Sequence, residues 1–184
     1  MAVTLFLSGP PKAGTSRLRG DLTELLRRSS VRRWFVEVLS PDSEGTWTND
    51  AWRMGRGLEA EALARRYKAA IKEAGHFFSP AFVMMKRTQL EGLLRWAELV
   101  IGDLGGIPSP ENAEIVSAAA GHRVIPIVLT RDGQDGGWTE FWRSRGLEPV
   151  VTAYHEDLAA ELLQGLFGEI MAADREAAAG KEVL

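Results

Sequence analysis

The sequence predicts an α/β fold, a doubly wound (flavodoxin- or Rossmann-like) five-stranded parallel sheet flanked by helices. Five short apolar segments alternate along the chain with segments whose apolar residues recur at helical spacing. Parallel strands are joined by helical crossovers that cover both faces of the sheet, so the strands are apolar along their whole length. The 184 residues, 45% of them hydrophobic, suffice for one domain with its own core, which we expect to span residues 1–184.

Each predicted strand is a short apolar run bounded by residues that interrupt regular structure. The first ends at Gly9-Pro10-Pro11, and the third ends at Asp103, shortly before the pair Gly105-Gly106. The five predicted strands are residues 3–8, 34–39, 96–104, 123–129 and 149–153.

The segments between the strands carry apolar residues three and four positions apart, as helices that cover a sheet do. Ser109 is expected to cap a helix that starts at Pro110, because a serine followed by proline is a strong start signal. Residues 40–57 are expected to form a polar loop. The predicted helices begin near residue 16, run over about 58–74 and about 83–96, begin at 110, lie near 141 and begin after 156.

Composition excludes several classes of function. The sequence has no cysteine, which rules out disulfides, thiolate metal sites and a thiol nucleophile. The formal net charge of −3 argues against binding to a nucleic acid polymer. No apolar run is long enough to cross a membrane, and the chain enters its first strand without a secretion signal. We therefore expect a cytoplasmic protein with no membrane partner.

The histidines give no sign of a metal site. His76, His122 and His155 are not paired at a ligand spacing, and each is interpreted as a surface or loop residue. The sequence therefore predicts no metal and no other cofactor.

The turn after the first strand is one wall of a candidate site. Ser8, Gly9 and the start of the following helix offer backbone N–H groups to an anion, and Lys12 adds a positive charge. The Gly-Lys-Ser/Thr ending of a P-loop is missing, and so is the G-x-G-x-x-G spacing of a dinucleotide site. An ordinary strand-to-helix turn is the alternative interpretation.

The segment from Asp103 to Glu114 is the second wall. The first and third strands of a doubly wound sheet are expected to be neighbours, so both walls would face one crevice at the carboxyl ends of the strands. Asp103 either binds a sugar hydroxyl or simply ends its strand, and Ser109 and Asn112 lie at the start of the next helix. Glu114 follows in the same helix, where a carboxylate can also serve as a capping residue.

Four tryptophans divide into two groups. Trp47 and Trp52, in the polar loop, are candidates to stack on a nucleobase, although loop tryptophans also cover the edge of a core. Trp138 and Trp142 are interpreted as packing residues.

Several of these segments together resemble the nucleoside 2-deoxyribosyltransferase superfamily, which includes nucleotide N-glycosidases that act on deoxynucleoside monophosphates or CMP. The similarity lies in residues 6–12, in the strand over 97–103, and in Ser109-Pro110 followed by Glu114-Ile115. It implies that Glu114 is the nucleophile that attacks the anomeric carbon, with Ser109 near the sugar or phosphate. It also implies that the site is completed across a homodimer interface.

The resemblance makes cleavage or transfer at an N-glycosidic bond of a nucleoside or nucleoside 5′-monophosphate the expected function. A carboxylate suits that chemistry because it can stabilise or trap an oxocarbenium-like transition state. Two alternatives stay open: a non-catalytic nucleotide-binding module of the same architecture, and a glutamate-dependent hydrolase that cleaves NAD. The base, the sugar, the 5′-phosphate requirement and the acceptor are not determined by the sequence.

Overall fold

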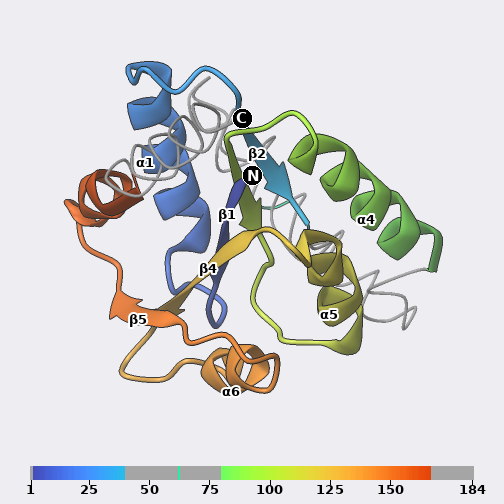
Figure 1. Cartoon of the computed structure of the whole chain (residues 1–184). Helices are drawn as coiled ribbons and strands as arrows, with labels where there is room; N and C mark the ends of the chain where they lie inside the picture. Colours follow the sequence, from blue (N-terminus) through green and yellow to red (C-terminus); the bar gives the residue numbers. More distant parts are fainter. Residues whose placement is uncertain (1, 40–61, 63–79, 167–184) are drawn as a thin grey trace.

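Five parallel strands form one sheet in the order β2-β3-β1-β4-β5 (Figure 1). The computed structural model describes residues 2–39, 62 and 80–166. The strands are β1 (Val3–Ser8), β2 (Trp34–Val38), β3 (Leu99–Asp103), β4 (Arg123–Thr130) and β5 (Val150–Ala153). The predicted fold class is confirmed, and each predicted strand agrees with an observed one to within a few residues.

The order of the strands places β1 at the centre of the sheet. It pairs with β3 on one side and with β4 on the other, so the predicted contact of the first and third strands is confirmed. In the flavodoxin-like order the first strand lies between the second and third, whereas here β3 lies between β2 and β1. β1 and β3 are buried at every residue, while β5, at the edge, is largely exposed.

Helices cover both faces of the sheet (Figure 1). On one face lie α1 (Thr15–Arg27) and the helical residues 158–166, whose leucines pack against alternate side chains of β1. On the other face lie α4 (Pro80–Leu94), α5 (Pro110–Val116), the short 3₁₀ helix η1 (Ser117–Ala119) and α6 (Trp138–Arg143). Within the described ranges, no helix is long and apolar enough to cross a membrane.

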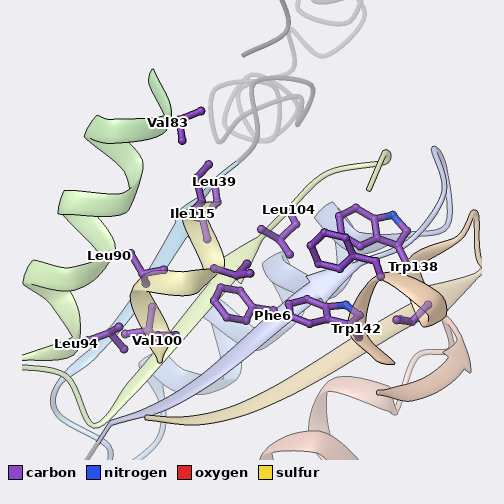
Figure 2. Close-up of a cluster of buried hydrophobic side chains, with 14 of the residues drawn as sticks. Phe6, Leu39, Val83, Leu90, Leu94, Val100, Leu104, Ile115, Trp138 and Trp142 are labelled. Atoms are coloured by element: carbon purple, nitrogen blue, oxygen red, sulfur yellow. The ribbon is translucent and has the colours of Figure 1, made fainter. Parts of the chain in front are cut away.

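The face covered by α4, α5 and α6 holds the largest buried side chains (Figure 2). Trp138 and Trp142 are fully buried, which confirms that they are packing residues. The Trp142 ring stacks on Phe6 at 5.5 Å between centroids, and its Nε1 donates to the Ser8 hydroxyl at 3.0 Å. Burial of side chains of this size contributes about 1.5–3 kcal/mol each, so these contacts fix α6 against β1 and β4.

The parallel arrangement brings the carboxyl ends of all five strands to one edge of the sheet. The turns after β1, β3, β4 and β5 therefore lie close together, and the middle of this group is the β1–α1 loop, residues 9–14. The predicted polar loop over 40–57 and the predicted helix over about 58–74 fall outside the described residues, apart from residue 62.

Candidate functional site

The β1–α1 loop is built for close approach to its neighbours. A Cβ atom at Gly9 would lie 2.5 Å from the Leu129 carbonyl oxygen at the end of β4, so only glycine fits there. Lys12 and Gly14 have positive φ angles of 68° and 105°, and the Ala13 amide donates to the Pro10 carbonyl at 3.0 Å. This tight turn delivers the chain directly from the centre of the sheet into α1.

The first turn of α1 leaves its amides without an internal acceptor. The first backbone bond runs from Leu18 N to Gly14 O at 2.9 Å, so the amides of Thr15, Ser16 and Arg17 precede the helical ladder. Gly14 is the N-cap and carries no side chain to accept from them, and no acidic residue lies in the first turn. Such a helix start is suited to a negatively charged ligand.

Two further helix starts at this edge, those of α5 and α6, are closed by side chains. At α5, Ser109 Oγ accepts from the Asn112 amide at 3.2 Å, and the predicted cap and the proline in the first turn are both confirmed. At α6, the Asp135 carboxylate accepts from the amides of Gly137 at 2.9 Å and Thr139 at 3.1 Å. A hydrogen bond from the Thr139 side chain first, and then these backbone bonds, lower the pKa of Asp135 below its ordinary value.

Three neighbouring turns pack on the β1–α1 loop. Pro11 Cγ lies 2.9 Å from where a Cβ would stand at Gly106, after β3. Arg131, after β4, donates from Nη1 to the Pro11 carbonyl at 3.4 Å. Tyr154, after β5, lies against Gly14, with its Cβ atom 3.1 Å from where a Cβ would stand. The loop is thus held from three sides by elements far apart in the sequence.

Tyr154 and its partners form a second layer beside the loop. Its hydroxyl donates to Asp21 Oδ2 at 2.7 Å, and the guanidinium of Arg17 lies 4.8 Å from its ring centroid. Partial burial first, and then the bond to Asp21, raise the pKa of Tyr154 above its ordinary value. The contact therefore links the end of β5 to the first two turns of α1.

Asp103 is buried in an ion pair that the sequence did not predict. The residue is fully buried at the end of β3, and its Oδ2 accepts from Arg19 Nη1 at 2.9 Å. Its Oδ1 accepts from the Gly105 amide at 3.2 Å. Arg19 comes from the second turn of α1, its side chain is 3% exposed, and its Nη2 has no partner among the described residues.

Two of the other predicted binding residues, Ser8 and Asn112, make hydrogen bonds within the protein. Ser8 is fully buried and donates to the Ile127 carbonyl at 3.0 Å, in addition to accepting from Trp142. Asn112 is also buried, and its Nδ2 donates to the Ile107 carbonyl at 2.9 Å. Its Oδ1 has no partner within the described part of the chain. Trp47 and Trp52 lie outside the described residues.

Glu114 lies on the exposed side of α5, and its carboxylate has no hydrogen bond or ion pair with a described residue. Its backbone carbonyl accepts from the Ser117 hydroxyl. Among the described residues, no group of three or more histidine, aspartate or glutamate side chains is arranged to hold a metal ion.

A cavity of about 360 Å³ lies away from the β1–α1 loop, between α5, η1, α6 and the sheet. Its lining is mostly apolar and includes Phe6, Val116 and Trp142. Arg145 lies at this cavity over the Phe141 ring, with 3.8 Å between its Cζ and the ring centroid, and burial lowers its pKa. None of the predicted site residues that the structure describes lines this cavity.

No protein-family model matches the sequence, and no curated protein matches it significantly. Solved structures do match the chain, among them the following three. A de novo designed protein with a P-loop NTPase fold has a TM-score of 0.51 at 9% identity, over 95% of this chain and 96% of the other. The protein APE1195 has a TM-score of 0.47 at 13% sequence identity, and the match covers 93% of this chain and 96% of the other. A shikimate kinase from Acinetobacter baumannii, in complex with shikimate, has a TM-score of 0.43 at 16% sequence identity, and the match covers 92% of this chain and 95% of the other. Of the three, the designed protein alone exceeds a TM-score of 0.5, and at 9% identity it shows the fold alone.

The fold is therefore the Rossmann-like fold of P-loop NTPases, and the resemblance to the nucleoside 2-deoxyribosyltransferase superfamily is wrong. The short motifs behind that resemblance are apolar strands and helix starts, which many doubly wound sheets contain. The prediction of a glycosidase or deoxyribosyltransferase that breaks an N-glycosidic bond is wrong with it, and the nucleophilic role of Glu114, which the resemblance implied, loses its basis.

One sequence signal could have indicated the correct fold. Gly9, Gly14 and Ser16 keep the spacing of the P-loop pattern G-x-x-x-x-G-K-[ST], and Thr15 stands at the position of the lysine. The lysine of the pattern is absent, and for that reason the sequence did not predict a P-loop. The two glycines are nevertheless present, and they are the residues that allow the backbone of the turn. The Arg19–Asp103 pair had no comparable signal, because its partners are 84 positions apart.

Proposed function

We propose that the chain is a nucleotide-binding protein whose β1–α1 loop and first turn of α1 hold the phosphate groups of the ligand. The observation that carries the proposal is the uncapped start of α1. The amides of Thr15, Ser16 and Arg17 lack an internal acceptor at the centre of the carboxyl edge of the sheet. Phosphate oxygens are acceptors of the kind and charge that such a helix start binds.

The charges around the loop favour an anion. Lys12, Arg17 and Arg131 are all within or beside the loop, and the nearest buried carboxylate, Asp103, is neutralised by Arg19. A neutral nucleoside would leave the helix start without a charged partner, so nucleotides are expected to bind more tightly than nucleosides.

We assign ligand binding to this site and no catalytic step. In P-loop NTPases the lysine of the motif cradles the β- and γ-phosphates during transfer. Thr15 occupies that position here, and Lys12, three residues earlier, projects from a left-handed residue of the loop. The chain thus has the loop and helix-start amides of a phosphate site, but it lacks the lysine that promotes phosphoryl transfer.

The decisive experiment is calorimetric titration with ATP, ADP, AMP and adenosine. The phosphorylated ligands should bind, and adenosine should bind weakly or not at all. Replacement Lys12→Gly preserves the left-handed turn and removes one charge, so affinity for ADP should fall about fivefold, the scale of an exposed charge contact. Lys12→Arg should retain most of the affinity.

Arg32→Ala is the matched control, because Arg32 is exposed just before the amino end of β2, at the opposite edge of the sheet. It removes the same charge from the whole protein and should leave ADP binding unchanged. Equal affinity of the wild-type protein for adenosine and AMP would contradict the proposal.

Three finer expectations join this proposal. We infer a single domain over residues 1–184 that assembles at least as a homodimer in the cytoplasm. Met84 and Met85 on α4 are 65% and 52% exposed, which supports an interface on that helix. Light scattering that shows only a 20.2 kDa species at micromolar concentration would contradict the dimer.

A further inference from the structure

The oxygen atoms at the carboxyl edge of the sheet are not arranged as the ligands of a magnesium site. In P-loop NTPases, Mg²⁺ is held by the Ser or Thr of the loop and by an aspartate of a second motif, and it bridges the phosphates of the nucleotide. Ser16 stands at the first of these positions. Asp103, at the end of the strand next to β1, is the carboxylate that the topology offers for the second.

Both oxygens of Asp103 are already engaged by the protein. Oδ2 accepts from Arg19 at 2.9 Å and Oδ1 from the Gly105 amide at 3.2 Å, in a residue with no exposed surface. A divalent ion at this carboxylate would lie against a buried guanidinium, and the two positive charges would repel each other in a poorly solvated site. The residues present therefore do not fit Mg²⁺ at Asp103.

A second carboxylate at this edge is engaged as well. Asp135 gives its two oxygens to the start of α6, at 2.9 and 3.1 Å. Release of Asp103 would leave buried donors without partners, and release of Asp135 would leave the half-buried Thr139 amide without one, which costs free energy.

The guanidinium of Arg19 offers a positive charge close to the proposed phosphate site, as a bridging cation would. It lies one turn after Thr15 on the same side of α1, since residues four apart are neighbours on a helix. Asp103 fixes its Nη1, while Nη2 is buried without a partner among the described residues. A buried, unpartnered donor on a permanently charged group indicates an acceptor that is still to be bound.

We propose that Arg19, held in place by Asp103, takes the role of the divalent cation, so that the ligand binds as its metal-free anion. This inference rests on the proposed phosphate site at the β1–α1 loop. A fixed guanidinium can donate to a phosphate oxygen with a defined direction and without a metal. Mg²⁺ in solution then competes for the phosphates and lowers the charge of the ligand that reaches the site.

The test is calorimetric titration of the full chain with ADP and with pyrophosphate, once in excess EDTA and once in excess Mg²⁺. Affinity in EDTA should equal or exceed that in Mg²⁺. In a parallel titration with ADP present, the electron paramagnetic resonance signal of Mn²⁺ should show no ion bound by the protein beyond that bound by ADP alone. Binding that appears only with Mg²⁺, or a protein-bound Mn²⁺ signal, would overturn the inference and leave the phosphate site standing. No binding under either condition would overturn both.

Arg19→Ala provides the second arm. Removal of the guanidinium should reduce affinity in EDTA at least about tenfold, the scale of a lost hydrogen bond to a charged group. It also frees Asp103, so part of the affinity should return when Mg²⁺ is added. Arg27→Ala is the matched control, because it removes an arginine from the exposed end of the same helix. Its affinity should equal that of the wild type under both conditions. An Arg19→Ala protein that is folded by circular dichroism and binds as the wild type does in EDTA would refute the role of Arg19.

Discussion

At Gly9 a single methyl group decides whether the β1–α1 loop can form. The added Cβ would lie 2.5 Å from the Leu129 carbonyl oxygen and 3.2 Å from Ala13 Cβ, and neither atom belongs to a flexible side-chain end. The loop and the end of β4 must therefore separate in Gly9→Ala. Overpacking of this kind costs about 1–3 kcal/mol, so thermal unfolding should show a melting temperature several degrees below that of the wild type.

Gly20→Ala is the matched control for that prediction. Gly20 lies within α1, and nothing lies within 4 Å of its added Cβ. Alanine in the interior of a helix is favoured over glycine by about 0.5–1 kcal/mol, so this variant should melt at a higher temperature than the wild type. A Gly9→Ala protein as stable as Gly20→Ala would show that the loop is not packed as described.

The buried pair of Arg19 and Asp103 gives a second prediction at the residue scale. Removal of either partner leaves the other buried and charged, which costs about 3–5 kcal/mol. We expect Asp103→Leu to be strongly destabilised in urea denaturation, and the double variant Arg19→Met with Asp103→Leu to recover much of the loss. Additive losses in the double variant would contradict a direct coupling of the two side chains.

At the scale of the element, the start of α6 depends on Asp135, which lies two residues before the N-cap Gly137. The carboxylate accepts from two amides at the start of the helix, and Asp135→Ala should cost about 0.5–2 kcal/mol at neutral pH. Because the pKa of Asp135 is lowered in the folded state, its contribution is present above the ordinary aspartate value of 3.8 and is lost as the pH falls through the lower folded value.

Urea denaturation of the wild type and Asp135→Ala at a series of pH values checks this dependence. The difference in free energy of unfolding between the two proteins should be constant near neutral pH and should shrink below about pH 3.8. A difference that grows on acidification would show that the protonated side chain makes the stabilising contact.

At the scale of the whole molecule, the proposed ligand must bind against an unfavourable net charge. The formal charge of the chain is −3, so attraction of a nucleotide depends on the local cations and the start of α1. Charges in solvent are screened over about 8 Å at physiological ionic strength. The dissociation constant for ADP should therefore rise steadily with added potassium chloride. In Lys12→Gly this increase should be smaller than in the wild type, because one of the screened charges is missing. A constant that does not change with salt would argue for a ligand held mainly by apolar contacts.

The sequence by itself determined the class of fold and the positions of the elements. Apolar runs and helical spacing are local properties, and they predicted all five strands, the cap at Ser109 and the packing role of Trp138 and Trp142. Local pattern also predicted that β1 and β3 are neighbours, because a doubly wound sheet places its crossing point there. These predictions succeeded because the burial of one face of a helix or strand sets the spacing of its apolar residues, and that spacing can be recognised within each segment alone.

Only the tertiary structure decided what the carboxyl edge of the sheet offers to a ligand. The sequence placed both Asp103 and Glu114 in the candidate site, yet the first is buried against Arg19 and the second lies on the exposed side of α5. The choice depends on which distant segments meet, and Arg19 and Asp103 are 84 positions apart. Short motifs cannot specify that contact, because the Arg19–Asp103 pair forms only where α1 packs against β3.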